Sequence, residues 1–191
     1  MAEHQIEVIG LTNSASTEEI ETASTFEENA LLKARHYHLK SGLPTVADDS
    51  GLEVDALGGA PGVYSARYAG ADSGDTGRVV RLLDEMKRGS DPNRRARFTC
   101  AAAAVWEGGE RVFLDHVQGV ILTRARGENG FGYDPVFLYE PLGKTFAELT
   151  STEKAEVSHR GRAFRQLASW LIKSGLLDTP RSGDRIVTTA D

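Results

Sequence analysis

The stretch Thr45-Val46-Ala47-Asp48-Asp49-Ser50-Gly51 decides the fold class, because a short apolar run ends there in two adjacent carboxylates. The apolar part is too short for a helix and is followed by glycine, so it predicts a buried strand. In open α/β sheets, ligands bind at the carboxyl ends of such strands. Two neighbouring acids in a partly buried site need a cation or a shared proton, because like charges raise each other's pKa. The alternative is that Asp48 or Asp49 is a turn residue before Gly51.

The composition is that of an ordinary globular protein. Hydrophobic residues make up 40% and charged residues 26% of 191 residues, and no apolar run is long enough to cross a membrane. Cys100 is the only cysteine, so no internal disulfide is possible, the thiol is expected to be buried and inert, and a cytoplasmic setting fits. A net charge of −6 argues against sequence-independent binding to nucleic acid.

Strand and helix patterns alternate along the rest of the chain, which predicts one domain over residues 1–177 and a polar, frayed tail over 178–191. Apolar residues at helical spacing predict three helices, the last with Phe164, Leu167, Ala168, Leu171 and Ile172 on one face. The expected elements are a strand at 6–9, a loop at 13–24, a helix from Thr25 to near Gly42, a helix at 75–88, strands at 96–106 and 111–122, a glycine-rich loop at 127–133, and a helix capped by Ser158.

Three polar residues near the start of the first helix are candidates for a site. Glu28 lies three residues after Thr25, so its carboxylate also fits a reciprocal helix cap, which is the favoured interpretation from these residues alone. Asn29 and Lys33 are four residues apart, so both could face one site, although Lys33 alone would be an ordinary solvated lysine.

A second group of candidates lies in the glycine-rich loop and before the last helix. Three glycines allow the loop to approach a ligand closely, and Phe131 and Tyr133 offer flat faces for a base. Asp134 offers an acceptor, and Lys154 precedes Ser158-His159-Arg160 at a predicted helix N-terminus suited to electronegative atoms. A plain glycine turn and a structural histidine are the alternatives.

Five ordered motifs together resemble the Ham1/inosine triphosphate pyrophosphatase family, from about residue 6 to about residue 176. The motifs are Thr25-Phe26-Glu27-Glu28-Asn29-Ala30-Leu31-Leu32-Lys33-Ala34-Arg35, Ala47-Asp48-Asp49-Ser50-Gly51-Leu52, Gly58-Gly59-Ala60-Pro61-Gly62-Val63-Tyr64-Ser65-Ala66-Arg67, Gly130-Phe131-Gly132-Tyr133-Asp134-Pro135 and Ser158-His159-Arg160-Gly161. The resemblance implies an elongated α/β fold, with a central mixed sheet flanked by helices and two lobes around an active cleft. It also implies a homodimer with no nucleic-acid or membrane partner.

The resemblance further implies Mg²⁺-dependent hydrolysis of non-standard purine nucleoside triphosphates (ITP, dITP and XTP) to the monophosphate and pyrophosphate. Asp49 resembles the metal-binding acid and general base, Glu28 the second metal ligand, and Asp48 a supporting carboxylate. Lys33 is similar to the helix lysine directed at the phosphates, and Ser50 to a substrate contact. Seven residues are similar to those of the family's nucleobase pocket: Phe131, Gly132, Tyr133, Asp134, Lys154, His159 and Arg160.

Hydrogen bonding explains how such a pocket selects its base. Lys154, His159 or Arg160 can donate to the 6-oxo group of hypoxanthine or xanthine, whereas adenine presents an amino donor at that position. Donors left unpaired against adenine give discrimination of ~10⁴. Guanine also has a 6-oxo group, so its exclusion needs a further feature.

One departure from the family concerns the start of the chain. Members begin with a strand and a phosphate-binding loop of the type Thr/Ser-x-Asn-x-x-Lys, whereas the first strand here resembles their second. A missing inner strand would leave buried backbone groups unpaired, at roughly 1–3 kcal/mol each. The sequence therefore predicts reduced turnover, and two hypotheses stay open: an active pyrophosphatase whose given start is too far downstream, or a truncated homologue that binds nucleotides or a partner protein.

Overall fold

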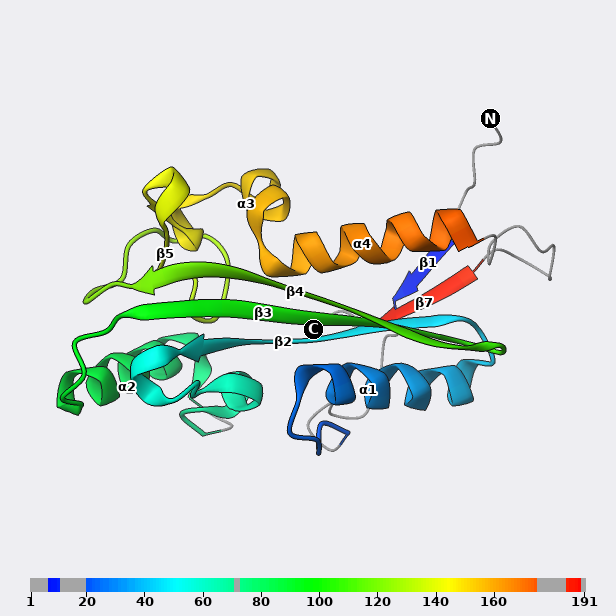
Figure 1. Ribbon diagram of the computed structural model, residues 1–191, viewed down its shortest axis with the longest axis horizontal. Coiled ribbons are helices and arrows are strands. Elements are labelled where there is room, and N and C mark those ends of the chain that lie inside the picture. Colours follow the sequence, from blue (N-terminus) through cyan, green and yellow to red (C-terminus); the bar gives the residue numbers. More distant parts are fainter. Residues whose placement is uncertain (1–6, 11–19, 71–72, 175–184, 190–191) are drawn as a thin grey trace. The chain divides into compact units, whose positions relative to one another are not determined.

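The computed structural model describes residues 7–10, 20–70, 73–174 and 185–189 (Figure 1). Its contacts divide the protein into two compact units, and the chain passes from one unit to the other several times. Unit 1 comprises Met1–Asp49, Cys100–Leu114 and Ala163–Asp191, and unit 2 comprises Ser50–Thr99 and Asp115–Arg162. Neither unit is a continuous segment, and the single domain over residues 1–177 stays a prediction.

Strands and helices alternate, as the sequence predicts for an α/β fold. The helices are α1 (Phe26–Ser41), α2 (Gly74–Arg88), α3 (Ser151–Val157) and α4 (His159–Ser174), and short 3₁₀ turns occupy Asp55–Leu57, Gly62–Arg67, Glu140–Leu142 and Phe146–Glu148. The strands are β1 (Glu7–Gly10), β2 (Thr45–Val54), β3 (Arg95–Trp106), β4 (Gly109–Ile121), β5 (Phe137–Tyr139), β6 (Lys144–Thr145) and β7 (Arg185–Thr189). None of the helices in these described ranges combines the length and apolar character needed to cross a membrane.

The strands follow the order β1-β7-β2-β3-β4-β5-β6 in a mixed sheet. Strand β7 is parallel to both β1 and β2, whereas β5 is antiparallel to β4 and β6. The predicted α/β fold with a central mixed sheet is therefore confirmed.

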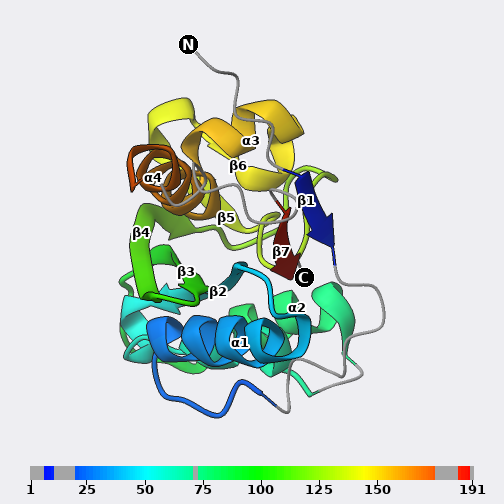
Figure 2. The same ribbon diagram turned by 90° about the vertical axis from the view of Figure 1, so that its right-hand side faces the viewer.

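Unit 1 contains helix α1 and most of helix α4, on opposite faces of its strands (Figures 1 and 2). Helix α1 begins as predicted, since the Thr25 hydroxyl accepts a hydrogen bond from the Glu28 backbone N–H, and its buried face includes Phe26, Ala30, Ala34 and Tyr37. On the α4 side, the core of the unit consists of Val46, Cys100, Ala102, Ala104, Ala163, Leu167 and Leu171.

Unit 2 has its own apolar core between helix α2 and the remaining strand segments. Helix α2 buries Val79, Leu82 and Met86, with Leu83 packed against the same core, as its spacing predicts. Phe98 stacks near the centre of the unit, with ring centroids 4.7 Å from Phe137 and 5.8 Å from Phe146. This aromatic cluster supports the loop and helices that carry the second group of candidate residues.

Strand β2 is longer than the sequence predicts. It continues through Asp48 and Asp49 to Val54 instead of ending before them, so the turn interpretation of these aspartates is wrong. Gly51 does not break the strand, because β2 neighbours β3 and its later residues Leu52 and Val54 are buried. Strand pairing and burial outweigh the weak local signal of one glycine.

The carboxyl-terminal region also differs from the prediction. Residues 185–189, which the sequence places in a polar tail, form β7, because two neighbouring strands supply hydrogen-bonding edges that local composition cannot reveal. In helix α4, Ala168 and Ile172 are exposed, since the buried stripe follows Ala163, Leu167 and Leu171. The predicted cap is present, because the Ser158 hydroxyl accepts from the Gly161 backbone N–H at 3.1 Å.

We expect Leu52→Ala to lower the free energy of unfolding by about 2–5 kcal/mol, because Leu52 is fully buried and truncation leaves a cavity. Leu39, which is 83% exposed, provides the control, and Leu39→Ala should change stability by less than about 0.5 kcal/mol. Urea unfolding measures both values. Equal effects of the two substitutions would contradict the described core.

Candidate active site

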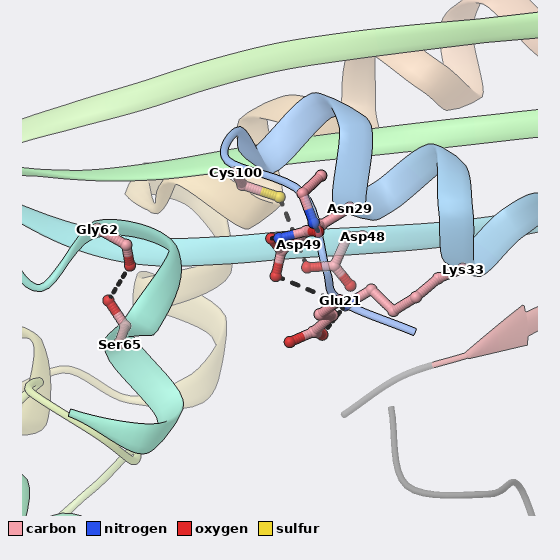
Figure 3. A network of polar contacts seen from close by, with 9 residues as sticks. Glu21, Asn29, Lys33, Asp48, Asp49, Gly62, Ser65 and Cys100 are labelled. Atoms are coloured by element: carbon pink, nitrogen blue, oxygen red, sulfur yellow. Dashed lines mark hydrogen bonds and ion pairs between the residues drawn. The ribbon is translucent and has the colours of Figure 1, made fainter. Parts of the chain in front are cut away.

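The carboxylates of β2 and the polar residues of α1 meet inside unit 1 (Figure 3). The Asn29 side-chain amide donates to one oxygen of Asp49 at 3.0 Å, and the Lys33 ammonium lies 3.6 Å from the other. Asn29 is itself oriented by a hydrogen bond from the Ala23 backbone N–H to its side-chain oxygen at 2.9 Å. Asn29 and Lys33 therefore both contact Asp49, as their four-residue spacing on one helix allows.

Lys33 also pairs with Glu21, from the segment that leads into α1. The ammonium nitrogen lies 2.6 Å from a Glu21 carboxylate oxygen, and Lys33 is only 1% exposed. A buried ammonium is stable only when it is paired and hydrogen-bonded. The two carboxylates of Glu21 and Asp49 provide this pairing, so the lysine is a fixed positive charge.

Asp48 adds a third carboxylate to this cluster. It is buried like Asp49, and the Cys100 thiol lies 3.6 Å from one of its oxygens. Cys100 is fully buried, as predicted. The cluster therefore brings the carboxylates of Glu21 and Asp49 to one ammonium, with buried Asp48 next to Asp49 in β2.

Burial raises the pKa of Asp49 to about 6. Desolvation is the largest cause, the charge of Lys33 opposes it, and the neighbouring charges of Glu21 and Asp48 add to the rise. A carboxyl group with such a pKa can accept and release a proton near neutral pH.

A second ion pair lies in unit 2, where the partly buried Lys154 ammonium contacts the buried Asp134 carboxylate. Asp134 also accepts a hydrogen bond from the Phe131 backbone N–H at 2.8 Å, while Asp75 accepts from the N–H of Gly132 at 2.6 Å. Burial raises the pKa of Asp134, against the opposing effect of Lys154. These contacts hold both ends of the Phe131-Gly132 turn.

The backbone N–H of Phe131 is hydrogen-bonded to Asp134, whereas the residue as a whole is 59% exposed. The Lys154 ammonium lies 4.4 Å from the ring centroid, and the Arg160 guanidinium carbon lies 5.6 Å from it. An exposed aromatic face bordered by two cationic donors can stack on a planar, electronegative ring such as an oxopurine.

His159 is buried, as are Tyr133 and Asp134. Its ring stacks on Phe98 with centroids 4.7 Å apart, and its Nδ1 atom is buried without a hydrogen-bond partner among the described residues. Burial lowers the pKa of His159 to about 3, helped by the charges of Arg160 and Lys154. The imidazole is therefore neutral near pH 7.

Glycine is required at position 130 of the loop. Its φ angle is +76°, and a Cβ atom there would lie 2.0 Å from the Asp134 carboxylate. The loop therefore closes over Asp134 only because position 130 has no side chain. Tyr133 lies on the inner side of this loop, buried, with its hydroxyl donating to the Ser65 carbonyl at 3.0 Å.

A comparison with protein families identifies the chain. The Ham1 family model matches residues 1–170. The chain belongs to the Ham1 family. This agrees with the resemblance carried by the five sequence motifs.

Two bacterial members illustrate how similar this Ham1-family chain is to its relatives. The dITP/XTP pyrophosphatase of Syntrophobacter fumaroxidans is 51% identical over 162 residues, which cover 81% of this chain and 69% of that protein. The dITP/XTP pyrophosphatase of Bacillus subtilis is 47% identical over 167 residues, which cover 86% of this chain and 84% of that protein.

Solved Ham1 structures are similar in fold as well. The Staphylococcus aureus Ham1 protein has a TM-score of 0.76 at 43% identity and covers 81% of this chain and 80% of its own. A HAM1 protein from Coxiella burnetii has a TM-score of 0.80 at 36% identity and covers 88% of this chain and 100% of its own.

The structure places the residues predicted for the site of this Ham1-family protein in two groups, one in each unit. Unit 1 contains Glu28, Lys33, Asp48 and Asp49, and unit 2 contains Ser50, Phe131, Gly132, Tyr133, Asp134, Lys154, His159 and Arg160. Asp49 and Ser50 are consecutive in β2, where the chain passes from one unit to the other. The catalytic, metal-binding and substrate roles of these residues stay predictions.

Glu28 differs from the other members of its group. It is exposed in the first turn of α1, and its described contact is the donation of its backbone N–H to Thr25, which is one half of the predicted capping box. Its carboxylate forms no hydrogen bond or ion pair with any residue in the described ranges. Glu28 is therefore an accessible carboxylate on the first turn of α1, adjacent in sequence to Asn29.

Sequence reasoning missed Glu21. It lies in a polar stretch that predicts only a loop, and no spacing rule connects it to Lys33 or Asp49. Only the burial of Lys33 would have pointed to such a partner, because a buried lysine requires a carboxylate. Nothing in the sequence indicated that Lys33 is buried.

We expect Asp49→Asn to stabilise the metal-free protein in a pH-dependent manner. Because the folded-state pKa of Asp49 lies above its ordinary value of 3.8, its stabilising contribution is present below pH 3.8 and is lost as the pH rises through 6. Relative to the variant, the parent should therefore lose roughly 2–3 kcal/mol between pH 4 and 7. Urea unfolding in a chelator measures this difference, and parallel pH profiles would contradict the raised pKa.

Proposed function

We propose that this protein hydrolyses dITP, ITP and XTP to the monophosphate and pyrophosphate, and so removes non-standard purine nucleotides from the nucleotide pool. Curated relatives at 43–51% identity are dITP/XTP pyrophosphatases. The observation that carries the proposal is the buried cluster on β2 and α1, where Lys33 lies between the carboxylates of Glu21 and Asp49.

A divalent metal ion fits the charge of this cluster. Three carboxylates exceed the single positive charge of Lys33, and oxygen atoms are the ligands that Mg²⁺ prefers. In the described ranges, no group of three or more His, Cys, Asp or Glu side chains is arranged to hold a metal. This suits Mg²⁺, which is commonly bound by one or two carboxylates and by substrate phosphates. Asp49 and Glu28 would hold the ion, which would neutralise charge on the phosphates.

The protein's own groups supply the rest of the hydrolysis. Asp49, with a pKa of about 6, accepts a proton from the water that attacks the α-phosphorus, and Asp48 supports it. The new bond joins the water oxygen to phosphorus, and the bond from the α-phosphorus to the pyrophosphate oxygen breaks. The fixed ammonium of Lys33 stabilises the negative charge that develops on the phosphates.

The residues of unit 2 select the base. Phe131 stacks on the purine, while Lys154 and Arg160 provide donors for its 6-oxo group, since both cations lie next to the Phe131 ring. Asp134 holds Lys154, and Gly132, Tyr133 and Ser50 complete the substrate contacts. Neutral His159 can donate one ring N–H to the base without adding charge.

The setting and assembly form part of this proposal. The protein works in the cytoplasm, which suits a chain whose only cysteine is a buried thiol. It acts as a homodimer, without a nucleic-acid or membrane partner. The family resemblance supports these statements.

A binding protein without turnover is the second candidate function. Nucleotide binding without pyrophosphate release would support it.

We expect the purified protein with Mg²⁺ to release pyrophosphate from dITP and XTP, and Asp49→Asn to lower kcat by about 10²–10⁴-fold, because proton transfer is lost. A coupled pyrophosphate assay measures the rates. The control Asp84→Asn changes an exposed aspartate of α2 and should leave kcat unchanged. Unchanged turnover by Asp49→Asn would remove Asp49 from its role.

We expect Phe131→Ala to raise the KM for dITP by about 5- to 150-fold with a smaller change in kcat, because stacking on one base is worth about 1–3 kcal/mol. Steady-state kinetics separate the two parameters. Leu142→Ala, which truncates another exposed apolar residue of unit 2, is the matched control. An unchanged KM would show that the base does not stack on Phe131.

A further inference from the structure

Strand β7 occupies an inner position in the sheet although it comes from the carboxyl-terminal part of the chain. It lies between β1 and β2, parallel to both (Figures 1 and 2). All three strands belong to unit 1, at least over the residues of β2 that precede Ser50. Strand β7 therefore pairs with one edge of β1 and one edge of β2, which would be unpaired without it.

The register of β7 brings its end close to the catalytic carboxylates. Val187 lies opposite Ile9 of β1 and Thr45 of β2, and Thr189 lies opposite Ala47. Ala47 immediately precedes Asp48 and Asp49 in sequence. Strand β7 ends opposite Ala47 whereas β2 continues to Val54, so the carboxyl end of β7 lies beside the segment of β2 that carries Asp48 and Asp49. Ligands of α/β sheets bind at the carboxyl ends of parallel strands.

Helix α1 rests on the same strand. Contacts join α1 to β7, and α1 carries Asn29 and Lys33, the two residues that hold Asp49. Strand β7 therefore supports the site twice, through its pairing with β2 and through its packing beneath α1. A displacement of about 1 Å between such groups can lower a rate by about 10²-fold.

We propose that β7 is a positioning element of the active site, which fixes Asp48 and Asp49 relative to Lys33 so that the metal-bound triphosphate can bind. The inference rests on the proposed function, because it assigns the strand to that same site. It assigns β7 no chemical step. Its contribution is the placement of groups on β2 and α1.

The direct test removes residues 185–191 and then supplies them in trans. We expect the shortened chain to lose at least about 100-fold in kcat/KM for dITP, and a synthetic peptide of residues 184–191 to restore much of it. A scrambled peptide of the same composition should restore nothing. Restoration by the native peptide alone would distinguish positioning by β7 from a general loss of folded protein.

Proline at one position provides a second test in the full chain. Val187→Pro removes a backbone N–H from an inner strand and should lower kcat more than it raises KM. Val187→Ile keeps that N–H and should retain the parent kcat. Trp106 and Trp170, whose rings pack together in unit 1 with centroids 5.1 Å apart, report by fluorescence whether the unit stays folded.

The outcomes separate this inference from the proposed function. Full activity of the shortened chain, or of folded Val187→Pro, would overturn the role of β7 and leave the pyrophosphatase proposal intact. An inactive full-length chain would instead contradict that proposal. Amide hydrogen exchange of the full chain then decides the role of β7, since residues 185–189 should be as protected as residues 47–49, and rapid exchange of β7 alone would overturn it.

Discussion

The burial of the Lys33 ammonium is the constraint on which unit 1 depends. A buried cation must be paired, and Lys33 meets this requirement with Glu21 from the segment before α1 and Asp49 from β2. Three stretches of chain are thereby fixed to one nitrogen atom. Because two carboxylates share this pairing, the ammonium keeps Glu21 as a partner when Asp49 is neutralised. The contacts that fix Asp49 relative to Lys33 therefore also help to hold unit 1 together.

Unit 2 uses the same rule for a different purpose. Lys154 is paired with buried Asp134, and the carboxylate of Asp134 also holds the backbone of Phe131. The result is a loop with a fixed backbone and an exposed ring, as Gly130 allows the chain to close over the carboxylate. Rigidity of this kind lowers the entropy that is lost when a base is bound. Each unit thus contains a lysine–carboxylate pair that fixes one of the two groups of candidate site residues.

The parts of the fold that were predictable from sequence are those in which local and tertiary preferences agree. Helix α1 has its cap at Thr25 and its apolar residues at helical spacing, so both its start and its buried face follow from the sequence. Strand β2 was recognised by its apolar beginning but not by its length. Its continuation past Gly51 depends on neighbouring strands, and no property of the stretch itself records them.

The sequence by itself determined the α/β class, the family motifs and the candidate groups Asp49, Lys33, Phe131 and Lys154, because residue type and spacing are local properties. Only the tertiary structure decided that Lys33 is buried, that Glu21 is its partner, and that β7 lies between β1 and β2. Each of these facts depends on contacts between residues that are distant in sequence, through hydrogen bonding or through burial from water. Burial and strand pairing are properties of the whole arrangement, and for that reason they could not be predicted from any single stretch.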